Sequence, residues 1–177
     1  MYQSKQSRYC YPETDVLINK ANLRELDQLE RFEKYATTAR LHQLNLKPIN
    51  GNFDFKHLSK IHWFIFQDVY PFAGKVRDED ISKGNFRFAL PQYIYSEADR
   101  IIGELKQDNY LKGLSLVKHV ERLAYYMAEL NVLHPFREGN GRTLTRIYSV
   151  FSTFIWARFG LESSGSKKYT ECDHSFR

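Results

Sequence analysis

Nine consecutive residues, from His134 to Arg142, bring four chemically useful groups together in the sequence HPFREGNGR. An imidazole titrates near neutral pH and can act as a general base toward an attacking hydroxyl. A glycine-rich turn that opens a helix binds phosphate through backbone N–H groups, and a guanidinium adds charged hydrogen bonds. A carboxylate can hold Mg²⁺ against those phosphates. The combination indicates phosphoryl or nucleotidyl transfer.

The order of the residues suggests a role for each group. His134 would be the base, and Glu138 would hold Mg²⁺ on a polyphosphate. Gly139 and Gly141 permit unusual backbone angles and the close approach of an anion. Arg142 falls in the first turn of the predicted helix, where a cation opposes the helix dipole. A bound polyphosphate would resolve that conflict.

Each feature alone has an ordinary structural explanation. A histidine before proline usually caps a helix, Gly-Asn-Gly usually makes a turn, and a glutamate beside an arginine usually forms a surface pair of little energetic value. Their coincidence within nine residues favours the functional interpretation. Phe136 is assigned to structure, and we expect it to anchor the loop in the core.

Helices must position this run. Apolar residues at intervals of three and four predict helices over about 22–45, after an N-cap at Asp54 up to Pro71, from Ser96 to Leu105, over about 115–133 and from Thr143 to Phe159. The run therefore lies between the last two helices, with its glycines at the start of the second. Pro135 ends the first of them and favours an extended residue before it.

The two flanking helices are strongly apolar. The predicted core face of 115–133 consists of Val117, Val120, Leu123, Ala124, Met127 and Leu130. The helix from Thr143 is apolar and aromatic, so we expect it to be central and buried. A β-hairpin is the one strand signal, because alternating residues flank a turn at Lys83-Gly84-Asn85.

Composition sets the class of protein. The chain has 177 residues, 42% of them hydrophobic and 27% charged, which suits one soluble domain. The net charge of +5 is spread along the chain, so we assign no nucleic-acid binding to it. Cys10 and Cys172 show no zinc-ligand spacing and no disulfide framework. No apolar signal core and no membrane-length apolar stretch occur, so we expect a cytoplasmic protein without membrane contact.

The run resembles the Fic (filamentation induced by cAMP) motif, HPFx(D/E)GNGRxxR, which protein adenylyltransferases carry. Further segments resemble the same family: 9–20 its N-terminal segment, 72–77 the approach to its flap, and 81–88 the flap itself. The resemblance covers about residues 8–142. It implies a mainly α fold, a Fic-type helical bundle with one small β-hairpin flap.

The residue pattern and the resemblance together predict a division of the chain. Residues 1–20 would be an N-terminal arm packed on the domain, and 21–160 would be the Fic domain. Within that domain, the flap hairpin would occupy about 76–90 and the active-site loop 134–142. Residues 161–177 would form a polar C-terminal tail.

The implied activity is transfer of AMP from ATP, with Mg²⁺, to a Ser, Thr or Tyr hydroxyl of a target protein that the sequence does not identify. His134 would deprotonate that hydroxyl, and Glu138 would hold Mg²⁺ on the α- and β-phosphates. The nucleotide-contacting residues would be Lys83, Asn131, Val132, Leu133, Gly139, Asn140, Gly141 and Arg142. Of these, 139–141 would form the anion nest, and Arg142 would reach the outer phosphates. The flap edge would align the target by strand addition.

The chain departs from the family pattern in two places. The second motif arginine would fall at Thr145, and the adjacent Arg146 is rotated by about 100° around a helix. Unless the helix shifts register, Arg146 does not replace it, and binding of the γ-phosphate is predicted to suffer. The sequence after Phe151 does not resemble the family's usual C-terminal helices.

Regulation and activity leave alternatives open. The family's autoinhibitory pattern, (S/T)xxxE(G/N), does not occur, so either a separate small antitoxin-like protein supplies a glutamate in trans to this toxin or the chain is not restrained that way. The first alternative to AMP transfer is a degenerate Fic domain that binds nucleotide or protein without catalysis. The second is a Doc-like kinase, against which Gly141 argues because that subgroup carries lysine there. Other donors, such as UTP or CDP-choline, also remain open.

Overall fold

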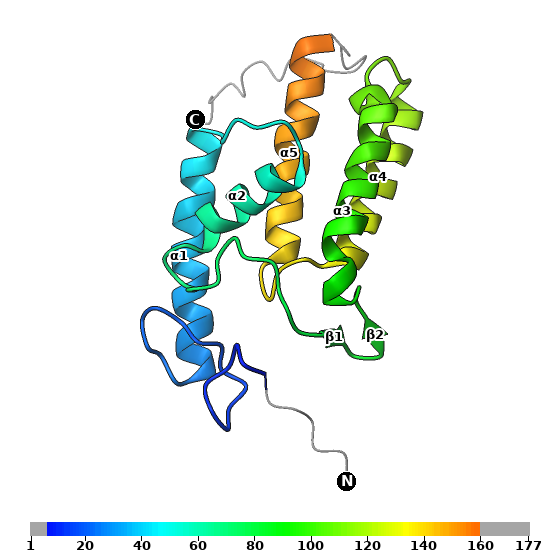
Figure 1. The fold of residues 1–177 in the computed structure, drawn as a ribbon. Coiled ribbons are helices and arrows are strands. Elements are labelled where there is room, and N and C mark those ends of the chain that lie inside the picture. The colour runs from blue at the N-terminus through cyan, green and yellow to red at the C-terminus, as the bar shows by residue number, and fades with distance from the viewer. Residues whose placement is uncertain (1–6, 160–177) are drawn as a thin grey trace, which may run out of the picture.

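A computed structural model describes residues 7–159 of the chain, with side chains to Thr153. Within it, five α-helices form a mainly α bundle, with the short α2 crossing between the longer helices (Figure 1). The helices are α1 Leu26–Leu46, α2 Phe55–Phe66, α3 Ile94–Gln107, α4 Leu116–Leu133 and α5 Asn140–Phe159; two 3₁₀ turns occupy Pro91–Tyr93 and Asn109–Leu111. The predicted fold class is confirmed.

A side-chain cap marks the start of α2, whereas the N-caps of α1, α3 and α4 make no side-chain capping bond. Asp54 caps α2 as predicted, because its carboxylate accepts a hydrogen bond of 2.7 Å from the backbone N–H of His57. Ser96 does not cap α3, which begins two residues earlier. Its hydroxyl instead donates to the carbonyl of Tyr93 at 3.1 Å. The prediction for that start is therefore wrong.

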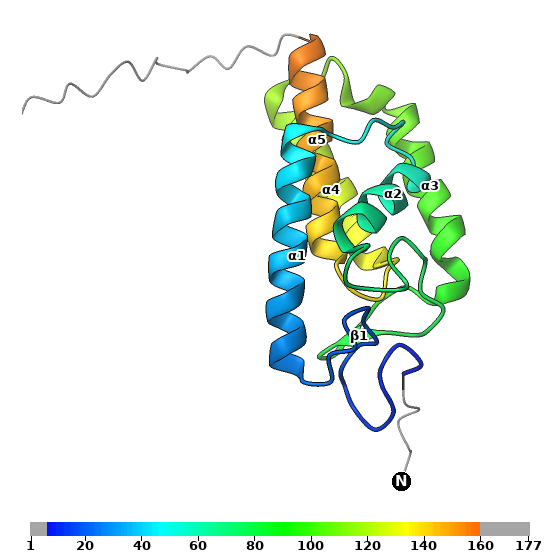
Figure 2. The ribbon, with the colours of Figure 1, turned by 90° about the vertical axis from the view of Figure 1, so that its left-hand side faces the viewer.

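The core surrounds α2, whose residues Ile61, Ile65 and Phe66 are fully buried. The N-terminal residues from Ser7 onward fold back beneath the bundle, beside β1 (Figure 2). They are held there because the hydroxyl of Ser7 and the backbone N–H of Arg8 both donate to the Glu79 carboxylate at 2.7 Å. The predicted tail, 161–177, lies outside the described residues.

The apolar face of α4 is not where periodicity predicts it. The buried residues of α4 are His119, Tyr126, Leu130 and Leu133, whereas Val117, Val120, Ala124 and Met127 are exposed. Four of the six predicted core residues therefore face outward. The reason is that α4 is apolar on both sides, so periodicity could not decide which side packs against α3 and α5.

Helix α5 stands between α1 and α4, as Figures 1 and 2 both show. Its central position agrees with the prediction, but only one face of its described side chains is buried. Leu144, Ile147, Tyr148 and Phe151 are buried, while the small residues Gly141, Thr145, Ser149 and Thr153 are exposed. None of the helices in the described part of the chain is long and apolar enough to cross a membrane.

The predicted hairpin is present but short. Strands β1 (Ser82–Lys83) and β2 (Phe86–Arg87) pair antiparallel, with Ser82 opposite Arg87 and Lys83 opposite Phe86. Gly84 has a positive φ of 57°, which the two-residue turn requires. Both strands are exposed, and the hairpin projects from the end of the bundle where α4 and α5 are joined (Figure 1).

Candidate active site

The motif loop, residues 134–139, connects α4 to α5. Phe136 anchors it as predicted, because its ring is buried and stacks on the ring of His62 at a centroid distance of 3.9 Å. Asn140 closes the loop from the helix side. Its side-chain oxygen accepts from the backbone N–H of Phe136 at 2.9 Å, and its amide donates to the Phe136 carbonyl at 2.8 Å. The Asn140 side chain therefore supports the loop, which leaves only its backbone for an anion.

His62 ties the loop to a second segment. Its Nε2 lies 2.8 Å from the carbonyl of Glu138, and its Nδ1 lies 2.8 Å from the backbone N of Gly74. A carbonyl only accepts and a backbone N–H only donates, so His62 must be neutral with its proton on Nε2. Burial lowers the pKa of His62 to about 4, which favours that form. Sequence reasoning missed this residue, since its only signal is a histidine on an apolar helix face.

His134 adopts the left-handed conformation, with φ 47° and ψ 60°, as the C-cap of α4. The expected extended backbone is therefore wrong, although this conformation also avoids the helical ψ that Pro135 disfavours. The backbone N–H of His134 still bonds the carbonyl of Leu130 at 3.2 Å, and its Nδ1 lies 3.0 Å from the carbonyl of Asn131. Nδ1 thus carries the proton, and Nε2 keeps a free lone pair.

The ring of His134 stacks on Phe88, beside the hairpin, at 3.8 Å between centroids. Burial lowers the pKa of His134, and the charges of Arg77 and Lys83 lower it further. The hydrogen bond to Asn131 opposes these effects without reversing them. The imidazole is therefore neutral at pH 7, as a general base must be. Lys83, in β1, is close enough for its charge to act on this ring.

The two motif glycines serve different purposes. Gly139 has φ 79°, and a Cβ there would lie 2.1 Å from the ring of Phe66, so only glycine fits. A Cβ on Gly141 would meet nothing within 4 Å, so packing does not explain this glycine. The backbone N–H of Thr143 bonds the carbonyl of Gly139 at 3.1 Å, and three amide groups precede that bond at the start of α5. These amides can receive an anion that approaches over Gly141.

Arg142 is held from the side by α1. Its guanidinium forms an ion pair with Glu33, donates to the hydroxyl of Thr37 at 3.2 Å and lies over the ring of Phe66 at 4.7 Å. It also lies 3.6 Å from the carboxylate of Glu138. Glu33 therefore neutralises the positive charge of Arg142, which the sequence had suggested only a bound polyphosphate would do. No local sequence pattern indicated this role for Glu33.

The Glu138 carboxylate could contribute one ligand to a Mg²⁺ ion that also binds substrate phosphates. One carboxylate oxygen accepts from the backbone N–H of Gly139 at 2.8 Å, and the side chain is partly exposed beside Arg142. Within residues 7–159, no three His, Cys, Asp or Glu side chains cluster to hold a metal by themselves. Mg²⁺ commonly binds through one or two carboxylates together with substrate phosphates, which is the arrangement available here.

The remaining expected residues lie as follows. Asn131 and Val132 are exposed at the end of α4, whereas the side chain of Leu133 is buried in the core and contributes only its backbone. Thr145 is exposed on α5. Arg146 points to the end of α1, where it bonds the side chain of Asn45 at 2.6 Å and the carbonyl of Leu44. It therefore does not replace the second motif arginine, as predicted.

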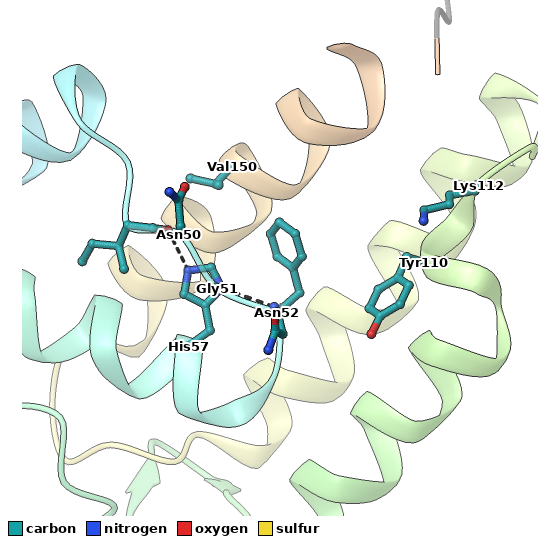
Figure 3. A pocket seen from close by; sticks show the side chains of 9 residues that line it. Asn50, Gly51, Asn52, His57, Tyr110, Lys112 and Val150 are labelled. Atoms are coloured by element: carbon teal, nitrogen blue, oxygen red, sulfur yellow. Dashed lines mark hydrogen bonds between the residues drawn. The ribbon is translucent and has the colours of Figure 1, made fainter. Parts of the chain in front are cut away.

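A separate cavity of about 450 Å³ lies at the other end of the bundle (Figure 3). Asn50, Gly51 and Tyr110 are among its lining residues. His57 holds the loop at its edge, because its ring nitrogens bond the carbonyl of Ile49 at 2.9 Å and the backbone N–H of Phe53 at 3.3 Å. No residue of the motif loop lines this cavity, so it is distinct from the candidate site.

Residues 52–151 match the model of the Fic/DOC family. The chain belongs to that family. It is 42% identical over 155 residues to protein adenylyltransferase VbhT of Bartonella schoenbuchensis, covering 88% of this chain and 31% of VbhT. It is 36% identical over 167 residues to probable protein adenylyltransferase y4lH of Sinorhizobium fredii, covering 94% of this chain and 83% of y4lH.

The fold is similar to that of BepC from Bartonella tribocorum, crystallised with bound AMPPNP. The TM-score is 0.75 at 27% identity, and the match covers 83% of this chain and 77% of BepC. The chain thus spans less than a third of VbhT and about four fifths of y4lH.

Proposed function

We propose that this protein transfers AMP from ATP to a Ser, Thr or Tyr hydroxyl of a target protein. The observation that carries the proposal is the contact of His134 Nδ1 with the Asn131 carbonyl at 3.0 Å, which puts the proton of the neutral ring on Nδ1 and leaves Nε2 to accept one. The names of the relatives VbhT and y4lH support the same reaction, and AMPPNP bound to BepC supports a nucleotide site in this fold.

In the proposed reaction, Nε2 of His134 takes the proton of the target hydroxyl while its oxygen attacks the α-phosphorus of ATP. A bond forms between that oxygen and phosphorus, the bond from the α-phosphorus to the bridging oxygen breaks, and pyrophosphate leaves. The stacked ring of Phe88 and the bond to Asn131 keep the imidazole in one orientation. Positioning the base in this way lowers the entropic cost of the transition state.

The start of α5 supplies the nucleotide site. The three backbone amides at the start of α5 would receive phosphate oxygens, and Arg142 would contact the outer phosphates when these compete with Glu33 for its guanidinium. Glu138 would hold Mg²⁺, which when bound neutralises phosphate charge. Asn131, Val132 and Lys83 would border the nucleotide, with Leu133 behind them.

The hairpin would align the target. Its two short strands are exposed, and the ring of Phe86 is half exposed next to Phe88, which touches the His134 ring. An extended peptide added to this edge would bring a hydroxyl toward His134 through backbone hydrogen bonds. Recognition would then depend less on the amino-acid sequence of the target than on whether the target segment can adopt an extended conformation.

The test uses ATP labelled at either the α- or the γ-phosphate, with Mg²⁺ and a bacterial lysate. Label from the α-phosphate should appear on protein with wild type and be lost with His134→Ala. The matched control is His42→Ala, since His42 is an exposed histidine on α1. Protein label from the γ-phosphate alone would identify a Doc-like kinase. Binding of ATP by calorimetry without transfer of either label would identify a non-catalytic Fic domain, which Thr145 favours.

A toxin role belongs to the same proposal. The absence of an inhibitory (S/T)xxxE(G/N) sequence suggests that a small antitoxin-like protein provides a glutamate in trans in the cytoplasm. Expression of the chain alone should then slow bacterial growth, and expression of His134→Ala should not. Equal growth of the two strains would contradict the toxin role while leaving AMP transfer to be judged by the labelling test.

A further inference from the structure

Arg77 is the largest fully buried side chain among the described residues, with only 1% of its surface exposed. It belongs to the segment that connects α2 to the hairpin. Its side chain makes four hydrogen bonds, and all of them end on backbone carbonyl oxygens. Within residues 7–159, no carboxylate forms an ion pair with Arg77; the charge of Asp80 acts on it, but Asp80 is paired with Arg87. A buried cation without a paired carboxylate is costly, so its hydrogen-bond geometry requires an explanation.

The carbonyls belong to two separate parts of the site. Nε donates to His134 at 2.7 Å, and Nη2 donates to Leu133 at 3.3 Å. Nη1 donates to Glu79 at 2.7 Å, and Nη2 also donates to Ala89 at 2.5 Å. Glu79 precedes β1 and Ala89 follows β2, so the guanidinium holds both ends of the hairpin and the motif loop at once.

Two backbone hydrogen bonds complete this connection. The N–H of Arg77 donates to the carbonyl of Pro135 at 2.9 Å, and the N–H of Ala89 donates to the carbonyl of Val132 at 3.3 Å. Between them lies His134 in a left-handed conformation, which a residue with a Cβ keeps only when its surroundings hold it. Arg77 bonds the carbonyl of that residue directly.

We infer that Arg77 is a positioning residue, which holds the backbone of His134 and the base of the hairpin in one fixed arrangement. The inference rests on the proposed function, because it makes presentation of the base and alignment of the target depend on one side chain. The planar fork of arginine is essential to this role. A lysine ammonium keeps the charge but cannot reach four carbonyls spread over two segments.

The variants are Arg77→Lys and Arg77→Met, with Arg100→Gln as the control. Arg100 also joins two elements, through ion pairs with Glu97 and Glu104 on α3 and Glu129 on α4, but it is exposed. We expect kcat per folded molecule to fall about tenfold to a hundredfold in both Arg77 variants, with KM for ATP nearly unchanged. The control should keep the wild-type kcat. Wild-type kcat in folded Arg77→Lys would overturn the inference.

Two measurements need no catalysis and separate this inference from the proposed function. Trypsin should cut after Lys83 and Arg87 faster in the Arg77 variants than in Arg100→Gln, because the hairpin is released. Amide exchange in the wild type should protect the N–H groups of Arg77 and Ala89 together. Exchange of Ala89 at the rate of a free loop would overturn the inference even if neither variant folds. Absence of transfer by the wild type would instead contradict the proposed function alone.

Discussion

Glu33 on α1 and Arg142 on α5 form an ion pair across 109 positions of sequence, beside the start of the helix that opens the candidate site. The other carboxylate oxygen of Glu33 accepts from the hydroxyl of Tyr70, whose pKa is raised by burial and by Glu33. The arginine expected to bind phosphate therefore already has an anionic partner. If ATP binds Arg142 as proposed, its phosphates must compete with Glu33 for the same guanidinium.

Glu33→Gln should tighten the binding of AMPPNP about three- to tenfold. The amide keeps a hydrogen-bonding side chain on Arg142 and Tyr70 but removes the negative charge that competes with phosphate. Calorimetry with Mg²⁺ measures the change. Glu30→Gln is the matched control, since Glu30 is exposed one turn earlier on α1. Weaker binding by Glu33→Gln would show that Glu33 orients Arg142 rather than competing for it.

The two motif glycines should respond oppositely to alanine. Gly139→Ala should destabilise the protein by about 3 kcal/mol, because the positive φ and the ring of Phe66 both reject a Cβ. Gly141→Ala should leave stability unchanged or raise it by up to about 1 kcal/mol, because the site is open and helical. It should nevertheless abolish nucleotide binding.

Urea unfolding and calorimetry on both glycine variants check these expectations. Tight AMPPNP binding by Gly141→Ala would exclude the start of α5 as the phosphate site. A fully stable Gly139→Ala would show that the motif loop can shift away from Phe66.

His62 should make folding depend on pH. Its pKa is about 4 in the folded protein, against about 6.5 when unfolded, so the unfolded chain takes up the proton first as pH falls. The stabilisation is complete above pH 6.5 and is lost between pH 6.5 and 4. The loss amounts to about 3 kcal/mol. Glutamine cannot titrate, so the free energy of unfolding of His62→Gln should fall by about 3 kcal/mol less between pH 6.5 and 4 than that of the wild type.

Denaturant titrations of the wild type and His62→Gln at several pH values measure the difference in their free energies of unfolding. Groups that titrate in both proteins cancel in this difference. Parallel pH profiles would contradict the fixed neutral state of His62. A difference that appears only above pH 7 would mean that folding raises the pKa of His62 instead of lowering it.

Thr145→Arg should raise kcat/KM for ATP about tenfold. Thr145 is exposed one turn after Arg142, so a long cation there can reach the outer phosphates without disturbing the core. Ser149→Arg, one turn further along the same exposed face, is the control and should have no effect. Equal activity of wild type and Thr145→Arg would mean that the missing arginine does not limit the reaction.

Local patterns predicted much of the site. Periodic apolar residues on both sides of the motif predicted the two helices, α4 and α5, that flank it. The large ring of Phe136 in a polar loop predicted that this residue is buried and anchors the loop. The hairpin follows from its turn residues. The left-handed His134 was not predictable, since Pro135 favours an extended neighbour and only the bonds from His134 to Leu130 and Arg77 reveal the alternative.

The sequence by itself determined the order and type of the helices, the hairpin and the chemical groups of the motif, because these depend on residues close together in the chain. Only the tertiary structure decided that Glu33 meets Arg142, that His62 meets Glu138 and that Arg77 meets His134. Each of these pairs spans more than fifty residues. Packing of whole helices brings such residues together, and no local pattern records it.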